Sequence, residues 1–157
     1  MATLITGGCG FIGTNLVARL NDSGIGPVVV FDNESLGRRE ALAGLQARFI
    51  HGDLRDRAAI DAALEGVEAV VHLAADTRVI DSISDPIFNF EANVRGSLNL
   101  LEAMRARGIR RLVNASTGGA IIGETEPPVH EAMVPRPMSP YGASKLAVEG
   151  YCSASRS

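Results

Sequence analysis

Tyr141 and Lys145 have the residue types and the spacing that proton transfer would need. Residues four apart lie on one face of a helix, and Lys145 is the only lysine of the chain. Free tyrosine has a pKa of about 10, and a neighbouring ammonium group favours the phenolate and lowers that pKa. The pair predicts a base that takes a proton from a hydroxyl near neutral pH. The alternative is a solvated helix on which the two residues lie close by chance.

Other polar residues could take part in the same reaction. Ser116 and Thr117 follow an apolar run, where a hydroxyl could hydrogen-bond to a reacting oxygen or simply form a turn. Asn93 interrupts a segment that otherwise favours a helix, and it could brace the loops of an active site or lie at the helix surface. His72 ends another apolar run, and we expect it to be a packed structural residue.

A glycine-rich segment follows the first apolar run of the chain, with Gly7, Gly10 and Gly13 in the spacing G-x-x-G-x-x-G. Without a Cβ the backbone can turn tightly and approach a pyrophosphate. The helix that follows directs its free N–H groups and its positive end at such a group. The segment therefore predicts a dinucleotide-binding loop, and the alternative is a turn that serves only the packing of a helix on a strand.

Acidic residues follow the next two apolar runs. Asp32 lies about 20 residues past the last glycine, where a carboxylate meets the ribose hydroxyls of adenosine and repels a 2′-phosphate. This predicts NAD rather than NADP as the cofactor, although Arg38 and Arg39 lie close enough in sequence to weaken that preference. Asp53 is placed to bind the amino group of adenine, or is only a turn or capping residue.

The elements that position these residues alternate along the chain. Five short runs of consecutive apolar residues are typical of strands buried on both faces: 2–6, 28–32, 47–51, 69–73 and 111–115. Helical patterns lie at 10–20, at 57–64 with Asp56 as cap, at 85–107 with Gly108 as stop, and from Ser139-Pro140 through Glu149. The third helix should bury one apolar face, which consists of Phe90, Val94, Leu98 and Leu101.

This alternation predicts an α/β fold with a doubly wound parallel sheet, a Rossmann-type NAD-binding domain that spans residues 1–157. In such sheets a ligand binds beyond the carboxyl ends of the strands, and the candidate residues follow the strands. The net charge of −3 gives no basic footprint for nucleic acid. No segment resembles a secretory signal or a membrane span, and Cys9 and Cys152 suggest neither a disulfide framework nor a metal site. We therefore expect a cytoplasmic protein without membrane partners.

Taken together, these motifs resemble those of the extended short-chain dehydrogenase/reductase family, in its branch of NAD-dependent sugar-nucleotide epimerases and dehydratases of the UDP-glucose 4-epimerase type. The matching segments are distributed along essentially the whole chain, in the order of the family: residues 6–13, 31–33, 37–39, 52–56, 72–75, 93–103, 116–120 and 139–145. The resemblance implies a set of cofactor-binding residues: Gly7, Gly10, Phe11, Ile12, Gly13, Asp32, Asn33, Asp53, Leu54, Leu73, Ala74, Ala75 and Lys145.

The resemblance also implies an activity, namely epimerisation of a nucleotide sugar by transient hydride transfer to NAD. Tyr141 would be the acid/base, Lys145 would hold the nicotinamide ribose, Ser116 or Thr117 would assist, and Asn93 would belong to the catalytic set. Similar dehydratases place an acidic pair directly after the threonine. Here two glycines, Gly118 and Gly119, occupy that place, so an epimerase is favoured over a dehydratase. Ile122 departs from the family, because relatives often have tyrosine at this position.

The length of the chain suggests alternatives to a complete enzyme. Members of the family are considerably longer, so we expect this chain to correspond to the N-terminal half, without the C-terminal lobe that binds the sugar. Weak or absent turnover would follow, because remote binding energy positions the reacting centre. The alternatives are a non-catalytic, truncated NAD-binding module, half of a split enzyme, and, as a second alternative activity, a nucleotide-sugar dehydratase. The resemblance implies a homodimer through the helices that carry Asn93 and Tyr141.

Overall fold

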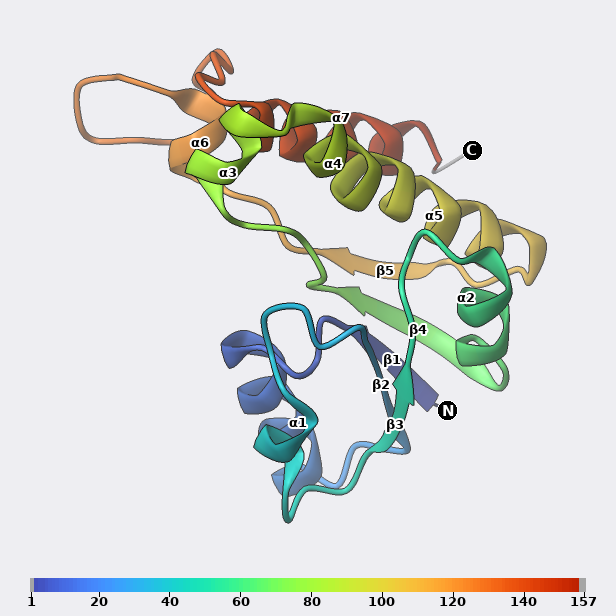
Figure 1. Cartoon of the computed structure of the whole chain (residues 1–157). Helices are drawn as coiled ribbons and strands as arrows, with labels where there is room; N and C mark the ends of the chain where they lie inside the picture. Colours follow the sequence, from blue (N-terminus) through green and yellow to red (C-terminus); the bar gives the residue numbers. More distant parts are fainter. Residues whose placement is uncertain (1, 156–157) are drawn as a thin grey trace.

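The computed structural model describes residues 2–155, and within them five parallel strands form one sheet with helices on both faces (Figure 1). The order of the strands across the sheet is β3-β2-β1-β4-β5. The bounds of the strands are β1 Ala2–Thr6, β2 Val28–Asp32, β3 Arg48–His51, β4 Val67–His72 and β5 Arg111–Asn114. The predicted doubly wound parallel sheet is therefore confirmed. No helix among the described residues is long and apolar enough to span a membrane.

The apolar runs of the sequence follow from burial on both faces of the sheet. All five residues of β2 are buried. Val29 and Phe31 contribute to the core on one face, and Val28 and Val30 contribute to the core on the other. Because successive side chains of a strand point to opposite faces, a strand covered on both faces needs apolar residues at every position. The buried strands are thus apolar throughout rather than alternating.

Two layers of helices cover the sheet. On one face, α1 (Phe11–Asp22) and the short 3-10 helix η1 (Arg39–Leu42) pack on β1 and β2. On the opposite face, α2 (Arg57–Ala63) and α5 (Gly96–Ala106) enclose the larger core. Three helices, α3 (Val79–Ser84), α4 (Pro86–Phe90) and α7 (Pro140–Ala154), pack together beside β5 (Figure 1). Short α6 (Gly118–Ile122) packs on the beginning of α7.

Local capping explains where several helices begin and end. The side chain of Asp56 accepts hydrogen bonds from the backbone N–H groups of Ala58 and Ala59 at the beginning of α2. Ser139 Oγ accepts one from Gly142 N–H, 3.1 Å away, and Pro140 occupies the first position of α7. Gly108 adopts a φ of 69° just past α5. These predicted ends are confirmed to within one or two residues.

The long helix predicted over 85–107 differs from the expectation. It consists of α4, a π-helical turn η2 (Glu91–Arg95) and α5. Of the predicted apolar face, Val94 and Leu101 are buried, whereas Phe90 is 45% exposed. A π turn inserts one residue into the helical repeat, so the face before the turn and the face after it do not share one period. The predicted single apolar face is therefore wrong for the first part of the helix.

Three short helices were not predicted, because each lacks a strong sequence pattern. They are η1, α3 and α6, of four, six and five residues. The ends of some strands also differ: β3 begins at Arg48 rather than at 47, and β4 covers Val67–His72 rather than 69–73. Helices of this length have too few residues for a repeating pattern, so they depend on contacts with the rest of the fold.

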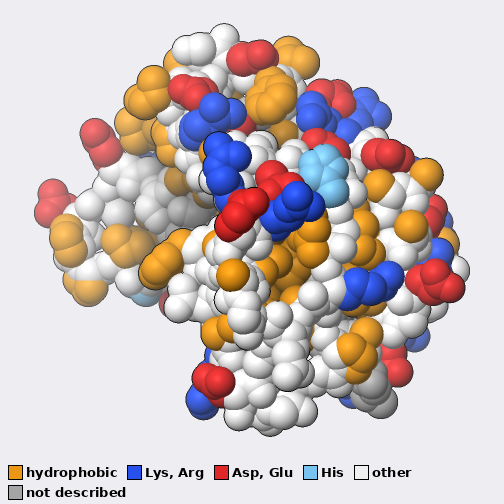
Figure 2. All heavy atoms as spheres, turned by 60° about the horizontal axis from the view of Figure 1, so that its bottom comes forward, with side chains coloured by type: hydrophobic (Ala, Val, Ile, Leu, Met, Phe, Trp, Pro, Cys, Tyr) orange, Lys and Arg blue, Asp and Glu red, His pale blue; other side chains and the backbone are white. Residues whose placement is uncertain are grey.

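Charges of both signs lie next to one another on the face shown in Figure 2. Ion pairs of the chain include Arg57 Nε with Asp61 Oδ2 at 3.1 Å and Arg105 Nη2 with Glu102 Oε2 at 2.7 Å. Exposed pairs of this kind stabilise a fold by only about 0–1 kcal/mol. In these pairs the positive charge of each arginine is offset by a neighbouring carboxylate.

A close approach between two loops occurs at Gly7, directly after β1. Its φ is 69°, and a Cβ at this position would lie 2.7 Å from the backbone nitrogen of Ala74, which follows β4. We predict that Gly7→Ala lowers the free energy of unfolding by about 2–4 kcal/mol, from the left-handed φ and from the collision. Urea unfolding measures this loss.

Gly24 provides the matched control, because its φ is 65° and a Cβ there would meet no atom within 4 Å. Gly24→Ala should therefore lose only the backbone part, about 1–2 kcal/mol. Equal losses in the two variants would mean that the contact between the loops is not as close as the structure has it.

Candidate active site

The carboxyl ends of four neighbouring strands enclose a pocket. Loops after β1, β2, β3 and β4 line it, together with Phe88 of α4. Nine of the predicted cofactor-binding residues belong to this lining: Gly7, Gly10, Asp32, Asn33, Asp53, Leu54, Leu73, Ala74 and Ala75. A larger hollow of about 630 Å³ lies elsewhere, between α5, β5 and α7, and none of the predicted site residues lines it. The predicted cofactor-binding residues thus converge on the smaller pocket at the strand ends, as expected for this type of sheet. None of the predicted catalytic residues lines it, namely Asn93, Ser116, Thr117, Tyr141 and Lys145.

Asp32, at the end of β2, joins the second strand to the glycine loop. The residue is buried, and its Oδ2 accepts a hydrogen bond from Cys9 N–H at 3.0 Å. Its Oδ1 accepts one from Glu34 N–H at 2.7 Å. A carboxylate offers about four lone-pair positions, so each oxygen keeps one for a ligand hydroxyl. The side chain is held in place before any ligand arrives.

The three glycines of the loop have different tasks. A Cβ at Gly13 would lie 2.5 Å from Gly8 Cα, so Gly13 permits the packing of α1 on its own loop. Gly10 lines the pocket, and a Cβ there would meet only the carbonyl oxygen of Gly7, at 3.3 Å. A side chain at Gly10 would therefore occupy pocket space, and its absence suits the close approach of a diphosphate.

Gly10 is also the N-cap of α1, which has no side-chain cap and so leaves its first N–H groups available. The next two predicted cofactor-binding residues, Phe11 and Ile12, have exposed side chains. What they can offer to a ligand is their backbone N–H groups. The loop and the beginning of α1 together fit a diphosphate that is bound by backbone.

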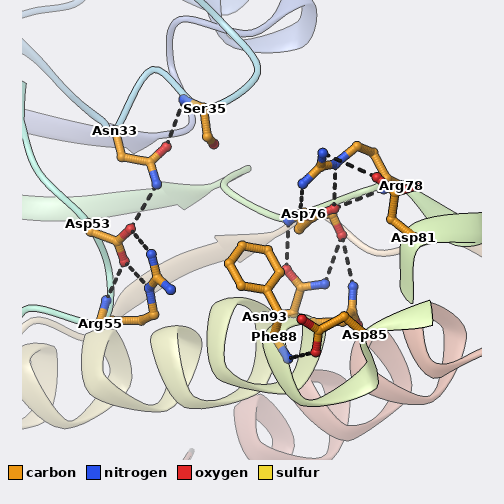
Figure 3. Close-up of polar contacts among 11 residues, drawn as sticks. Asn33, Ser35, Asp53, Arg55, Asp76, Arg78, Asp81, Asp85, Phe88 and Asn93 are labelled. Atoms are coloured by element: carbon orange, nitrogen blue, oxygen red, sulfur yellow. Dashed lines mark hydrogen bonds and ion pairs between the residues drawn. The ribbon is translucent and has the colours of Figure 1, made fainter. Parts of the chain in front are cut away.

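Asp53 is engaged by neighbours in the loop after β3 (Figure 3). Arg55 binds it in a bidentate manner, with Nε at 2.9 Å from Oδ1 and Nη2 at 2.8 Å from Oδ2. Asn33 Nδ2 donates to Oδ2 at 2.8 Å, and Arg55 N–H donates to Oδ1 at 2.8 Å. The hydrogen bonds from Arg55 hold the pKa of Asp53 well below its usual range.

These contacts fit the interpretation of Asp53 as a turn residue. The binding of adenine by Asp53 stays a prediction. Sequence reasoning missed Arg55, whose guanidinium carbon also lies 5.4 Å from the centre of the Phe88 ring. Arg55 thus connects the loop after β3 to α4 across one side of the pocket.

Lys145, in α7, is brought to the end of β5. The residue is buried, and its Nζ donates a hydrogen bond to the carbonyl oxygen of Ala115 at 2.6 Å. Ala115 directly precedes Ser116 and Thr117, so the Tyr–Lys helix and the hydroxyl-bearing loop meet at this contact. A Cβ on Gly142 would collide with the carbonyl oxygen of Ala120 in α6, which shows how closely the turn that carries Tyr141 packs on the segment after Thr117.

The pKa of Tyr141 departs from the sequence expectation. The sequence predicts that the ammonium of Lys145 lowers it, and the positive ring of bound NAD would act in the same direction. In the polypeptide, burial raises the pKa of Tyr141 instead, because the phenolate is disfavoured away from water. In the chain by itself, Lys145 therefore does not offset the effect of burial on this pKa, and the expected lowering in the presence of NAD stays a prediction.

The two candidate hydroxyls differ in exposure. Ser116 is exposed, whereas Thr117 is partly buried and is the N-cap of α6. Both stay candidates for the residue that assists Tyr141. The two glycines that follow, Gly118 and Gly119, begin α6 and present no side chain to the site.

Asn93 lies in the π turn and is 2% exposed, so the interpretation as a surface residue is wrong. Its Oδ1 accepts a hydrogen bond from Asp76 N–H at 2.7 Å, and its Nδ2 donates to the Asp76 carbonyl oxygen at 2.9 Å (Figure 3). Asp76 belongs to the loop after β4, and its carboxylate pairs with Arg78 at 2.6 Å. Asn93 therefore holds a loop that lines the pocket, and its membership in a catalytic set stays a prediction.

Sequence reasoning missed a group of buried polar residues behind the pocket. Ser82 Oγ accepts a hydrogen bond from Tyr141 N–H at 3.2 Å and so joins α3 to α7. Asn89, Asn93 and Ser97 are all buried and are spaced by four residues. A polar stripe at helical spacing beside an apolar stripe is the signal that could have shown a buried polar contact here.

Comparison with known proteins finds one family that matches nearly the whole chain. The model of the NAD dependent epimerase/dehydratase family matches residues 3–157. A UDP-glucose 4-epimerase from Mycolicibacterium smegmatis is 41% identical over 96% of the chain and 50% of its own length. The UDP-glucose 4-epimerase of Thermus thermophilus, solved in complex with NAD, is 44% identical with a TM-score of 0.93, over 98% of the chain and 50% of its own.

A dehydratase is also similar. The dTDP-glucose 4,6-dehydratase from Streptomyces venezuelae, solved with NAD, is 34% identical with a TM-score of 0.91, over 98% of this chain and 51% of its own. The chain thus spans about half the length of the curated relatives it matches.

The raised pKa of Tyr141 leads to a direct test. We predict that in the chain alone this phenol ionises above the ordinary value of about 10, because burial disfavours the phenolate. The ultraviolet absorbance of phenolate, followed against pH in the wild type and in Tyr141→Phe, isolates this group, since Tyr151 is the only other tyrosine. A midpoint for Tyr141 clearly below that of free tyrosine would show that the chain activates its phenol unaided.

Proposed function

The chain belongs to the NAD dependent epimerase/dehydratase family, and from this premise we propose that it binds NAD and carries the acid–base residues for 4-epimerisation of a nucleotide sugar. The observation that carries the proposal is the meeting of two sets of residues at one end of the sheet. One is the pocket of glycines and Asp32, and the other is the Tyr141–Lys145 helix, joined to the end of β5 by Lys145.

The pocket has the groups that each part of NAD needs. Gly10 and the first turn of α1 would hold the diphosphate, and the oxygens of Asp32 would accept hydrogen bonds from the adenosine ribose. Lys145 would hold the nicotinamide ribose. When bound, NAD supplies an acceptor for the hydride of a sugar carbon. A negative charge at Asp32 disfavours the 2′-phosphate of NADP.

The proton of the reaction is handled by residues of the chain. Tyr141 Oη takes the proton of the sugar hydroxyl when its carbon is oxidised, and returns the proton when that carbon is reduced on the opposite face. Ser116 or Thr117 donates a hydrogen bond to the same oxygen. Lys145 places a positive charge near this proton transfer, and its buried position keeps that charge in a fixed place.

Gly118 and Gly119 favour epimerisation over dehydration. Loss of water from a sugar needs an acid that protonates the departing hydroxyl. The position directly after Thr117, where similar dehydratases have an acidic pair, offers no ionisable group in this chain. The similarity of the chain to a dTDP-glucose 4,6-dehydratase therefore supports the oxidation step that epimerisation and dehydration share. It does not support the elimination of water.

A second candidate function is a non-catalytic NAD-binding module, or one half of a split enzyme. The observation that favours it is that none of the predicted catalytic residues lines the pocket of the cofactor-binding residues. A nucleotide-sugar substrate would then bind weakly or not at all. The two candidates share the cofactor and differ in turnover.

We also propose that two copies of the chain associate through α4 and α7. The segment before Asn93 exposes large apolar side chains, among them Ile83, Ile87 and Phe90, and α7 exposes Tyr151. Clustered apolar side chains at a surface of this kind favour contact with another protein. A homodimer through these helices would bury them beside the π turn that holds Asn93.

Binding of NAD by calorimetry is the first test. We predict that the wild type binds NAD and prefers it to NADP, and that Asp32→Ala weakens binding roughly 10- to 100-fold, as expected for lost hydrogen bonds to a charged group. Asp22→Ala, an exposed carboxylate at the end of α1, is the matched control and should bind as the wild type does.

Because Asp32 also holds the N–H groups of Cys9 and Glu34, a second variant tests the charge with less change to the loop. Asp32→Asn keeps one of the two oxygen acceptors and removes the charge, so NADP should gain relative to NAD. A folded wild type that binds no NAD would overturn the proposed function.

Turnover distinguishes the enzyme from the non-catalytic module. We predict that any conversion of UDP-glucose to its 4-epimer in the presence of NAD falls at least about 100-fold in Tyr141→Phe, because the variant lacks the acid–base group. Tyr151→Phe, on the same helix, is the control and should retain conversion. If the wild type binds NAD and converts no substrate, the epimerase proposal fails for this chain and the module remains.

A further inference from the structure

His72 is a buried histidine to which the proposed reaction assigns no role. It ends β4, is 3% exposed, and lies between two hydroxyl groups. Its Nδ1 is 2.7 Å from Thr6 Oγ1 at the end of β1, and its Nε2 is 2.8 Å from Ser97 Oγ in α5. Burial, and after it the positive charge of Lys145, lowers the pKa of His72 to about 3. The imidazole is therefore neutral at physiological pH and carries one proton.

The contacts of Ser97 determine which nitrogen carries that proton. Ser97 Oγ donates its only hydrogen to the carbonyl oxygen of Asn93, 2.5 Å away. Toward His72 it can then only accept, so Nε2 is the protonated nitrogen. Nδ1 is left as an acceptor, and Thr6 donates its hydroxyl hydrogen to it. Every hydrogen of this chain of hydrogen bonds therefore points in one direction, from Thr6 to Asn93.

The two ends of this series of hydrogen bonds lie at two parts of the candidate site. At one end, Thr6 Oγ1 accepts a hydrogen bond from Ala74 N–H at 3.3 Å, and Ala74 lines the cofactor pocket. At the other end is the carbonyl of Asn93 in the π turn. The side chain of Asn93 holds both backbone groups of Asp76, which also lines the pocket. In the other neutral tautomer, Nδ1–H would donate to Thr6 Oγ1 and Nε2 would accept the hydrogen of Ser97 Oγ, so that no hydrogen would remain for the Asn93 carbonyl.

The same network continues to the catalytic helix. Asn89 Nδ2 donates to the Asp76 carbonyl oxygen at 3.4 Å, and Asn89 Oδ1 accepts a hydrogen bond from Ser144 Oγ at 3.0 Å. Ser144 directly precedes Lys145 in α7. The position of the Asp76 loop is thus set from one side by α7 and from the other by the series of hydrogen bonds that includes His72.

We propose that His72, in its neutral Nε2–H tautomer, is a positioning residue that fixes the π turn with Asn93, and through it the Asp76 loop, relative to the strand ends of the cofactor pocket. This inference rests on the proposed function in so far as the pocket binds NAD. The residue itself touches no ligand. His72 Nε2–H donates a hydrogen bond to Ser97 Oγ. The hydroxyl hydrogen of Ser97 is therefore directed to the Asn93 carbonyl oxygen and to no other acceptor.

The test begins with the chain alone, without NAD. In protein labelled with ¹⁵N-histidine, we expect Nε2 of His72 to be protonated and Nδ1 to be unprotonated, unchanged down to about pH 5. The rate of hydrogen exchange at the Asp76 N–H then reports how firmly Asn93 binds the Asp76 loop. His72→Asn, whose amide reaches only the place of Nδ1, should speed this exchange at least tenfold, and Ser97→Ala should do the same.

Two variants control for general destabilisation. His72→Gln has an amide long enough to donate to Ser97 in the place of Nε2, so exchange at Asp76 should stay close to that of the wild type. Ile60→Val loosens the core under α2 without touching the chain of hydrogen bonds, and should leave the exchange at Asp76 unchanged relative to global opening. NAD affinity should fall several-fold in His72→Asn and be retained in His72→Gln.

The outcomes separate the two proposals. A wild type that binds no NAD overturns the proposed function, while nitrogen shifts and exchange still decide the role of His72. An imidazole protonated at Nδ1, or protonated at both nitrogens near pH 6, overturns the positioning role. So does a His72→Asn variant in which exchange at Asp76 and NAD affinity both match those of the wild type.

Discussion

The close approach of the loops that follow β1 and β4 is the constraint on which the site depends. Gly7 leaves β1 with a positive φ, and there is no room for a Cβ between it and the backbone of Ala74. This contact lies at the centre of the sheet, where β1 and β4 are neighbours. It places the glycine loop beside the segment that runs on to Asp76, and Asn93 then holds that segment from the helix side. These backbone segments form one part of the pocket, and side chains such as those of Asp32, Arg55 and Phe88 complete its lining.

Much of this arrangement could be predicted because it depends on local sequence. A strand buried on both faces must be apolar throughout, as β2 is, and Ser139-Pro140 marks the beginning of α7 by capping alone. The order of strand and glycine loop, and the position of Asp32 at the end of the next strand, place the dinucleotide pocket without any knowledge of contacts. Residues that serve the site through their backbone, such as Gly10, belong to this predictable part.

The remaining features arise from contacts between residues far apart in sequence, so no local sequence pattern predicts them. Asn93 is separated from Asp76 by the whole of α3 and α4, and its amide looks like an ordinary helix-surface residue until the loop is in place. The partner of Asp53 is a neighbour, Arg55, yet its bidentate geometry depends on the turn between them. The sign of the pKa shift of Tyr141 follows from burial against other elements, which sequence spacing alone does not give.

The π turn at Glu91–Arg95 fixes how α4 is rotated relative to α5 about the axis of the long helix. Its first part fits α7 and its second part fits the sheet, and the extra residue of the turn reconciles the two orientations. Removal of a single residue from this turn would restore an unbroken α-helix and rotate one part against the other by about 100°. Asn93 and Ser97 would then leave their partners while the helix itself became more regular. Insertions and deletions in this stretch are therefore restricted by rotational register, even though the segment is a helix that would tolerate most changes of side chain at its outer surface.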